Sequence, residues 1–174
     1  MSYLYSEIKK EIKTGDLIAW DSPKYSSLLT FVLFLYQKIT GTLYTHVGIV
    51  VKIGGRLYVV EAVPPMVRIF PLENHKRFYW IDATINAPAV KQLNFLTAKV
   101  GKPYSILDMF KIYLNMENSK EDYYCSELAA DFYTHFGYIT DPEAGYSPDT
   151  IVKAISEREG VDVVKVLMDK GNVK

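Results

Sequence analysis

Residues 45–63 read THVGIVVKIGGRLYVVEAV, and this segment contains two runs that are rich in β-branched residues. Gly54 and Gly55 separate the two runs. Two adjacent glycines between such runs predict a β-hairpin, because the two-residue turns that match the twist of paired strands need positive φ angles. With these turn residues, Ile53 lies opposite Arg56, and the rest of the register follows from this first pair.

The register of this hairpin brings a histidine and a glutamate together. Continuing from the turn, Gly48 lies opposite Glu61 and His46 lies opposite Val63. Since side chains alternate between the two faces of a sheet, His46 and Glu61 share one face as diagonal neighbours, roughly 7–8 Å apart between Cα atoms. Gly48 leaves room between them. A one-residue bulge in either strand would reverse this arrangement, and a solvent-facing charge on an edge strand is the alternative interpretation of Glu61.

Periodicity predicts the elements around the hairpin. Runs with a period of two or of about 3.6 predict strands at 16–20, 67–70 and 78–82, helices at 89–100, 105–116, 125–136 and 148–157, and a last strand at 161–167. The first helix places Val90, Leu93, Leu96 and Val100 on one face and stops before Gly101. Because strands come first and helices mostly later, the pattern indicates an α+β domain with an antiparallel sheet.

The composition bounds the class of protein. The chain has 174 residues, of which 49% are hydrophobic, and it contains no internal repeat, so we expect a single domain over residues 1–174 with its own core. The 20 Lys and Arg residues match 20 Asp and Glu residues. This zero net charge argues against a nucleic-acid binder, which usually carries a basic excess. The single cysteine excludes an internal disulfide and a Cys-rich zinc site.

The N-terminal residues MSYLYSEIKK lack the order of charged, apolar and small residues that is typical of a secretory signal. Together with the unpaired thiol, this favours a cytoplasmic protein. The segment Leu28–Tyr36 (LLTFVLFLY) is apolar apart from Thr30, but it is about half of the roughly 20 residues that cross a bilayer. We expect no stable membrane span, and this segment is either a buried helix or a face that lies on a membrane surface.

Cys125 is predicted to open the helix at 125–136. At a helix N-terminus the unpaired N–H groups and the helix dipole stabilise a thiolate, which lowers the pKa of the thiol and makes it a better nucleophile at neutral pH. The alternative is that Cys125 is a buried residue that acts as a small hydrophobe. Its spacing from Leu128 and Phe132 directs it towards the packed face of the helix.

A nucleophilic cysteine needs a base, and the chain offers three histidines. His75 lies in a polar stretch and is most simply a solvated loop residue, while His135 lies about 15 Å along the helix from Cys125. His46 begins a strand of Val, Ile and Gly residues, where an imidazole without a partner would be unfavourable. Glu61 can hold one imidazole nitrogen and leave the other for the thiol, as a catalytic triad requires.

Five short motifs follow one another along the chain: HVGIVV (46–51), VVEA (59–62), GKPY (101–104), YCSEL (124–128) and SPD (147–149). Taken together, they resemble the circularly permuted NlpC-like papain-fold hydrolases, from Thr14 to about Ile155. The resemblance implies a papain-like α+β fold, in which an antiparallel sheet or small barrel packs against helices. It also implies that the nucleophile lies at a helix N-terminus.

The resemblance implies a role for each matching residue. Cys125 is implied to be the nucleophile, His46 the general base and acid, and Glu61 the third member, which orients the imidazole. Tyr104 and Tyr124 are implied to position the substrate or to stabilise the oxyanion, with a core aromatic as the alternative for Tyr104. The backbone N–H of Cys125 is a further oxyanion donor.

We therefore predict a cysteine hydrolase, a peptidase-like or amidase-like thiol enzyme that cleaves an amide bond through a thioester. Its partner is a small peptide, amide or acyl substrate, and no metal or cofactor is required. A lipid-directed acyl hydrolase or transferase stays open, although such relatives commonly carry Asn-Cys-Glu-His where this chain has Tyr-Cys-Ser-Glu. A non-catalytic ligand-binding module also stays open, whereas a zinc site of Cys125 with two histidines lacks any recognised spacing.

Overall fold

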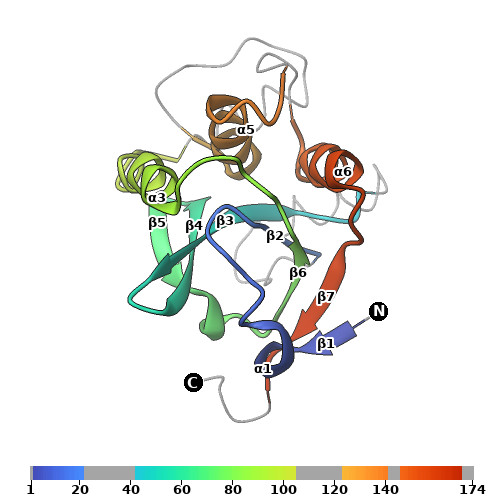
Figure 1. The fold of residues 1–174 in the computed structure, drawn as a ribbon. Helices are drawn as coiled ribbons and strands as arrows, with labels where there is room; N and C mark the ends of the chain where they lie inside the picture. Colours follow the sequence, from blue (N-terminus) through green and yellow to red (C-terminus); the bar gives the residue numbers. More distant parts are fainter. Residues whose placement is uncertain (1, 22–41, 105–122, 141–145, 170–174) are drawn as a thin grey trace.

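The structure is a computed structural model that describes residues 2–21, 42–104, 123–140 and 146–169. Figure 1 labels its elements along the chain. The strands are β1 (Ser2–Leu4), β2 (Leu17–Trp20), β3 (His46–Ile53), β4 (Arg56–Val63), β5 (Met66–Pro71), β6 (Arg77–Ile81) and β7 (Val164–Leu167). The helices are α1 (Tyr5–Ile8), the short 3-10 helix η1 (Leu72–Asn74), α3 (Ala89–Thr97), α5 (Cys125–His135) and α6 (Pro148–Glu159).

The strands of the described residues form one mixed sheet in the order β1-β7-β6-β2-β3-β4-β5. β1 runs parallel to β7, and the other neighbouring strands are antiparallel. The expectation of a papain-like α+β fold with an antiparallel sheet or small barrel is therefore wrong. The physical reason is the pairing of the first strand with the last, in which Ser2 lies opposite Lys165. β1 has only three residues, and all of them are exposed. Its sequence therefore has no periodicity from which this pairing could be predicted.

The hairpin of β3 and β4 has the predicted register. Ile53 lies opposite Arg56, and the pairing continues as predicted as far as Ile49. Gly54 and Gly55 have φ angles of 57° and 81°, the positive values that the two-residue turn requires. This part of the sheet is therefore confirmed residue by residue.

Gly48 lies on β3 at a point where a side chain would not fit. A Cβ atom there would lie 2.5 Å from Val59 Cγ2 and 3.0 Å from the Val60 carbonyl oxygen. We expect Gly48→Ala to lower the free energy of unfolding by about 1–3 kcal/mol, because the neighbouring strand would have to move. Urea unfolding followed by circular dichroism measures this loss. Lys52→Ala, at an exposed position of the same strand, should stay within about 0.5 kcal/mol of the wild type, and equal losses in the two variants would contradict the steric explanation.

Helices α3, α5 and α6 gather on one side of the molecule, and α1 lies at the opposite end (Figure 1). α5 packs on β3 and β4 and also contacts α6. The predicted packed face of α5 is confirmed, since Leu128 and Phe132 are fully buried in the core that includes β3, as are Ala129 and Tyr133. Phe136, one residue beyond the helix, is partly buried against the same core. A second buried cluster lies on the other face of the sheet, where alternate strand residues pack with residues of α1 and of the connecting segments.

The predicted apolar face of α3 is wrong in part. α3 ends at Thr97, so Val100 lies beyond the helix, where it is 39% exposed. Val90, in the first turn, is 60% exposed, whereas Gln92 and Leu96 are buried. The spacing argument extended the helix by about one turn, and of the four predicted residues Leu96 is buried and Leu93 is partly buried, whereas Val90 and Val100 are exposed.

Two predicted segments lie outside the described residues: the helix at 105–116 and the apolar run Leu28–Tyr36. Ser147 is the N-cap of α6, because its hydroxyl accepts a hydrogen bond from the backbone N–H of Thr150 at 3.2 Å. None of the described helices is long and apolar enough to cross a membrane.

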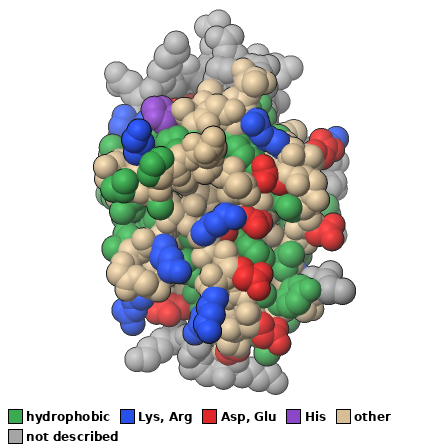
Figure 2. Space-filling model, viewed as in Figure 1, with side chains coloured by type: hydrophobic (Ala, Val, Ile, Leu, Met, Phe, Trp, Pro, Cys, Tyr) green, Lys and Arg blue, Asp and Glu red, His purple; other side chains and the backbone are tan. Residues whose placement is uncertain are grey.

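Charged side chains of both signs lie near one another on the surface. Figure 2 shows Lys and Arg side chains interspersed with Asp and Glu side chains on the face that it displays. Some of the charges form ion pairs, such as Lys13 with Asp82 and Arg77 with Asp21. Such exposed pairs contribute little to stability, typically below about 1 kcal/mol.

Candidate active site

Cys125 is the first residue of α5, as the sequence predicts, and it is buried. Tyr124 precedes the helix with extended backbone angles, φ −104° and ψ 171°. The backbone N–H groups of Val47 and Ser126 act to lower the pKa of the Cys125 thiol. Because Val47 is the second residue of β3, the start of this strand and the start of α5 meet at the thiol.

His46 is the first residue of β3, and hydrogen bonds fix the segment that leads into it. The backbone N–H of Thr45 donates to the carbonyl oxygen of the last residue of β2 at 2.8 Å. The Asp149 carboxylate, in the first turn of α6, accepts from the backbone N–H of Tyr44 at 2.8 Å and from that of Leu43 at 3.0 Å. β2 and α6 therefore both determine where the imidazole lies.

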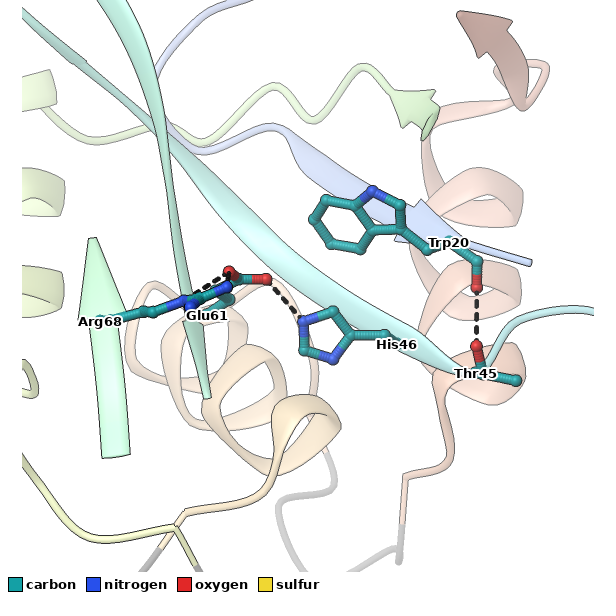
Figure 3. Close-up of polar contacts among 5 residues, drawn as sticks. All are labelled: Trp20, Thr45, His46, Glu61 and Arg68. Atoms are coloured by element: carbon teal, nitrogen blue, oxygen red, sulfur yellow. Dashed lines mark hydrogen bonds and ion pairs between the residues drawn. The ribbon is translucent and has the colours of Figure 1, made fainter. Parts of the chain in front are cut away.

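The Glu61 carboxylate lies between His46 and Arg68, as Figure 3 shows. Glu61 Oε2 lies 2.7 Å from His46 Nε2, and the Glu61 side chain is only 2% exposed. The other carboxylate oxygen, Oε1, accepts two N–H bonds from Arg68, one from Nε at 2.9 Å and one from Nη2 at 2.7 Å. His46 and Glu61 thus meet as the hairpin register predicts, and the carboxylate is held from both sides.

The imidazole of His46 also interacts with the side chain of Cys125, and this interaction acts to raise the pKa of His46. Because Nε2 faces Glu61, the other ring nitrogen, Nδ1, is left for the thiol. Cys125, His46 and Glu61 therefore form a row with the imidazole in the middle. Such a row can hold a thiolate next to a proton donor and can keep the ring in one orientation.

The electrostatics of the row favour charged forms of all three groups. Burial alone lowers the pKa of His46, but its interactions with Cys125 and Glu61 raise that pKa above its ordinary value. Burial alone raises the pKa of the Cys125 thiol, but the imidazolium, together with the two backbone N–H groups, lowers it. Burial also acts to raise the pKa of Glu61, and the opposing effects of His46 and Arg68 lower it to about 2. The three shifts therefore act together to favour a thiolate, an imidazolium and a carboxylate.

A network of polar side chains fixes the segment that leads into Cys125. Lys99 Nζ, just beyond α3, donates to the Tyr123 hydroxyl at 2.6 Å and to the Asp131 carboxylate at 2.7 Å. The Tyr123 hydroxyl in turn donates to Asp131 at 2.7 Å. Since Asp131 belongs to α5, the chain before the cysteine is bound both to the helix that follows it and to α3.

Trp20 covers the imidazole from β2. The ring centroids of Trp20 and His46 are 5.0 Å apart, and the same indole lies 4.7 Å from His75. His75 also contacts Phe70, at 5.3 Å between centroids. The prediction that His75 is a solvated loop residue is therefore wrong, because its ring packs between two aromatic rings. His135 lies at the end of α5 and stacks on an aromatic ring of α3, far along the helix from the thiol.

The two tyrosines implied as substrate or oxyanion residues lie beside the cysteine segment. Tyr124 is buried directly before α5. Tyr104 is half-buried, forms an isolated bridge with Tyr123, and donates its backbone N–H to the Pro65 carbonyl oxygen at 2.9 Å. The positions fit the implied roles, which stay predictions.

Sequence reasoning missed Arg68 and Trp20. A signal for Arg68 exists, because Val63 lies opposite Met66 across a two-residue turn, and the same register places Arg68 opposite Glu61. Trp20 had no comparable signal, since no short turn joins β2 to β3. Both residues belong to the site through strand pairing and not through a motif.

Among the described residues, no group of three or more His, Cys, Asp or Glu side chains could hold a metal ion. The two nitrogens of His46 already serve the thiol and the carboxylate. Cys125, His46 and Glu61 therefore do not converge on one point as metal ligands do.

Comparisons with known proteins identify a similar fold but do not indicate an activity. No family model matches the chain. The chain is 33% identical over 58 residues to the uncharacterized protein R372 of Acanthamoeba polyphaga mimivirus. This match covers 33% of the chain and only 23% of the mimivirus protein.

A solved structure is similar over most of the chain. It is the crystal structure of the metalloprotein yiiX from Escherichia coli O157:H7, DUF1105, with a TM-score of 0.53 and 22% sequence identity. The similarity covers 89% of this chain and 88% of that one. At this identity the similarity shows the fold alone. The similar structure is described as DUF1105 and not as a papain-like NlpC protein, which agrees with the mixed sheet of this chain.

Proposed function

We propose that this protein is a cysteine hydrolase that cleaves an amide bond through a thioester on Cys125. The observation that supports this most is one imidazole bound between a buried carboxylate and a buried thiol, with His46 Nε2 2.7 Å from Glu61. A nucleophile within reach of a base, which is itself oriented by a third group, is the arrangement of nucleophilic catalysis. The motifs that resemble those of permuted NlpC-like hydrolases support the same activity.

In this proposal, the Cys125 thiolate attacks the carbonyl carbon of the amide while His46 carries a proton on Nδ1. The C–N bond then breaks as His46 gives this proton to the leaving amine, and the acyl group stays on sulfur as a thioester. A water molecule loses a proton to His46 and attacks the thioester, which releases a carboxylic acid and restores the thiolate–imidazolium pair. The backbone N–H of Cys125 has no acceptor inside the helix and is the proposed oxyanion donor.

Glu61 orients the ring and does not take up the proton in this proposal. Its carboxylate is ionised, because His46 and Arg68 hold its pKa at about 2 against the effect of burial. The similar structure of yiiX is named a metalloprotein, but the described side chains of this protein do not form a metal-ligand set. The proposed reaction uses the side chains of Cys125, His46 and Glu61.

Intact-mass spectrometry of the protein mixed with peptidoglycan peptides, other amides and lipid esters tests the proposal. We expect a transient mass increase equal to the acyl part of an amide substrate, and we expect no increase in Cys125→Ala, which keeps the fold because the substitution is small. Circular dichroism of the variant checks the fold. An adduct from lipid esters alone would favour the lipid-directed alternative. Binding of panel members without an adduct would favour a non-catalytic module and contradict the proposal.

A further inference from the structure

We propose that Arg68 is a positioning residue of this site, which holds the Glu61 carboxylate towards His46 and balances its charge. The inference rests on the proposed function, because it concerns the same imidazole and thiol. It adds a fourth residue, from a strand that the motifs of the sequence do not include.

The geometry gives each carboxylate oxygen of Glu61 its own partner. Arg68 uses Nε and Nη2, at 2.9 and 2.7 Å, and both bonds go to Oε1. Oε2 is thereby left for His46 Nε2, at 2.7 Å. Rotation of the carboxylate would break both arginine bonds, so the oxygen that faces the imidazole stays in place.

The position of Arg68 is itself fixed by the sheet. β4 and β5 pair so that Arg68 lies directly opposite Glu61, which is the closest approach that two strands allow to facing side chains. The guanidinium also lies over the ring of Phe70, 4.6 Å from its centroid. Arg68 is 47% exposed while Glu61 is 2% exposed, so the arginine reaches from the surface to a carboxylate that water does not solvate.

The charges of the site sum to zero only when Arg68 is included. The charged groups that face one another are the Cys125 thiolate from α5, the His46 imidazolium from β3, the Glu61 carboxylate from β4 and the Arg68 guanidinium from β5. His75 lies beyond the indole that covers His46. Removing the guanidinium leaves an excess negative charge, which makes protons harder to remove from both the thiol and the imidazolium.

Removing the Glu61 carboxylate should make both protons easier to remove. This difference distinguishes a positioning role of Arg68 from a role that only stabilises the fold. The rate of Cys125 alkylation should change at two pH values, one where the thiol loses its proton and one where the His46 imidazolium does, and these are the two limbs of its pH profile. Arg68→Gln should shift both limbs to higher pH, and Glu61→Gln should shift both limbs to lower pH. From the distances and the partial exposure, each shift is about half to one pH unit. A salt bridge that only stabilises the fold would change the melting temperature and leave both limbs where they are.

Alkylation by iodoacetamide across the pH range, read by intact mass, is the experiment. The chain has a single cysteine, so the rate reports on Cys125 alone. The variants are Arg68→Gln, Arg68→Lys and Glu61→Gln, and circular dichroism checks their folding. Arg77→Gln is the matched control, because Arg77 is 44% exposed and pairs with Asp21 at 3.0 Å; its profile should equal that of the wild type.

We expect Arg68→Lys to keep both limbs within about 0.3 pH unit of the wild type, because it retains the charge. Unmoved limbs in Arg68→Gln, or limbs that move as far in Arg68→Lys as in Arg68→Gln, would overturn the charge-balancing role. A wild-type thiol that becomes reactive only near its ordinary pKa of about 8.5 would instead overturn the proposed function, and the role of Arg68 with it. If Arg68→Gln does not fold, the comparison of Arg68→Lys with Glu61→Gln still tests the charge-balancing role. Only Glu61→Gln should then shift the limbs of the pH profile.

Discussion

Replacing His46 by alanine is expected to lower the turnover of any substrate that forms the Cys125 thioester by about 10²–10⁴-fold. The imidazole both stabilises the thiolate and gives a proton to the leaving group, so its loss removes two contributions at once. The substitution should also raise the pH midpoint of Cys125 alkylation. Burial acts to raise the pKa of the thiol, and the largest opposing interactions come from His46.

His135→Ala is the matched control for this experiment. His135 lies at the end of α5 and stacks on Phe95, with ring centroids 4.4 Å apart. Its replacement should leave both the turnover and the alkylation midpoint unchanged. Equal midpoints in His46→Ala and the wild type would show that no ion pair exists between His46 and Cys125.

The hairpin and the position of Cys125 at a helix start could be predicted because they depend on local sequence. Gly54 and Gly55 determine a two-residue turn, and the turn determines the register of the strands on either side. From that register alone, His46 and Glu61 are neighbours, and the structure places their side chains 2.7 Å apart. Cys125 could be placed at a helix start because its helix has a clear apolar stripe.

Most of the rest depends on contacts between segments that are distant in the sequence, and the local signal for Arg68 is weak. β1 pairs with β7 although more than 150 residues separate them, and this pairing makes the sheet mixed. Arg68 opposes Glu61 across a Pro64-Pro65 turn, and two prolines do not have the positive φ preference that identified the first hairpin. Trp20 reaches His46 through the pairing of β2 with β3, which no short turn joins.

The Cys125 thiol and the His46 imidazole are positioned in the same way. Each lies at the first residue of its element, where a backbone can still change direction, and in each case a helix carboxylate binds the residues just before it. Asp149 of α6 accepts from the N–H groups that precede His46, and Asp131 of α5 binds Tyr123 before Cys125. The thiol and the imidazole are therefore positioned by helices as well as by the sheet, which limits how far either can move from the other.

The Glu61 carboxylate should make stability depend strongly on pH. Burial acts to raise its pKa, but His46 and Arg68 lower it from 4.5 to about 2. A carboxylate whose pKa is lowered on folding contributes stability that is fully present above the unfolded pKa and is lost as the pH falls through the folded pKa. The two values correspond to about 3 kcal/mol, present above about pH 5 and mostly lost by about pH 2.

Glu61→Gln removes this charge and keeps the size of the side chain. Urea unfolding should give the wild type about 3 kcal/mol more stability than the variant at about pH 6, with the difference closing towards pH 2. Glu73→Gln, at an exposed position of η1, is the matched control and should differ from the wild type by less than about 0.5 kcal/mol throughout. A difference that stays constant with pH would assign the effect of Glu61 to packing, because only an ionised carboxylate makes the loss follow the titration between pH 5 and pH 2.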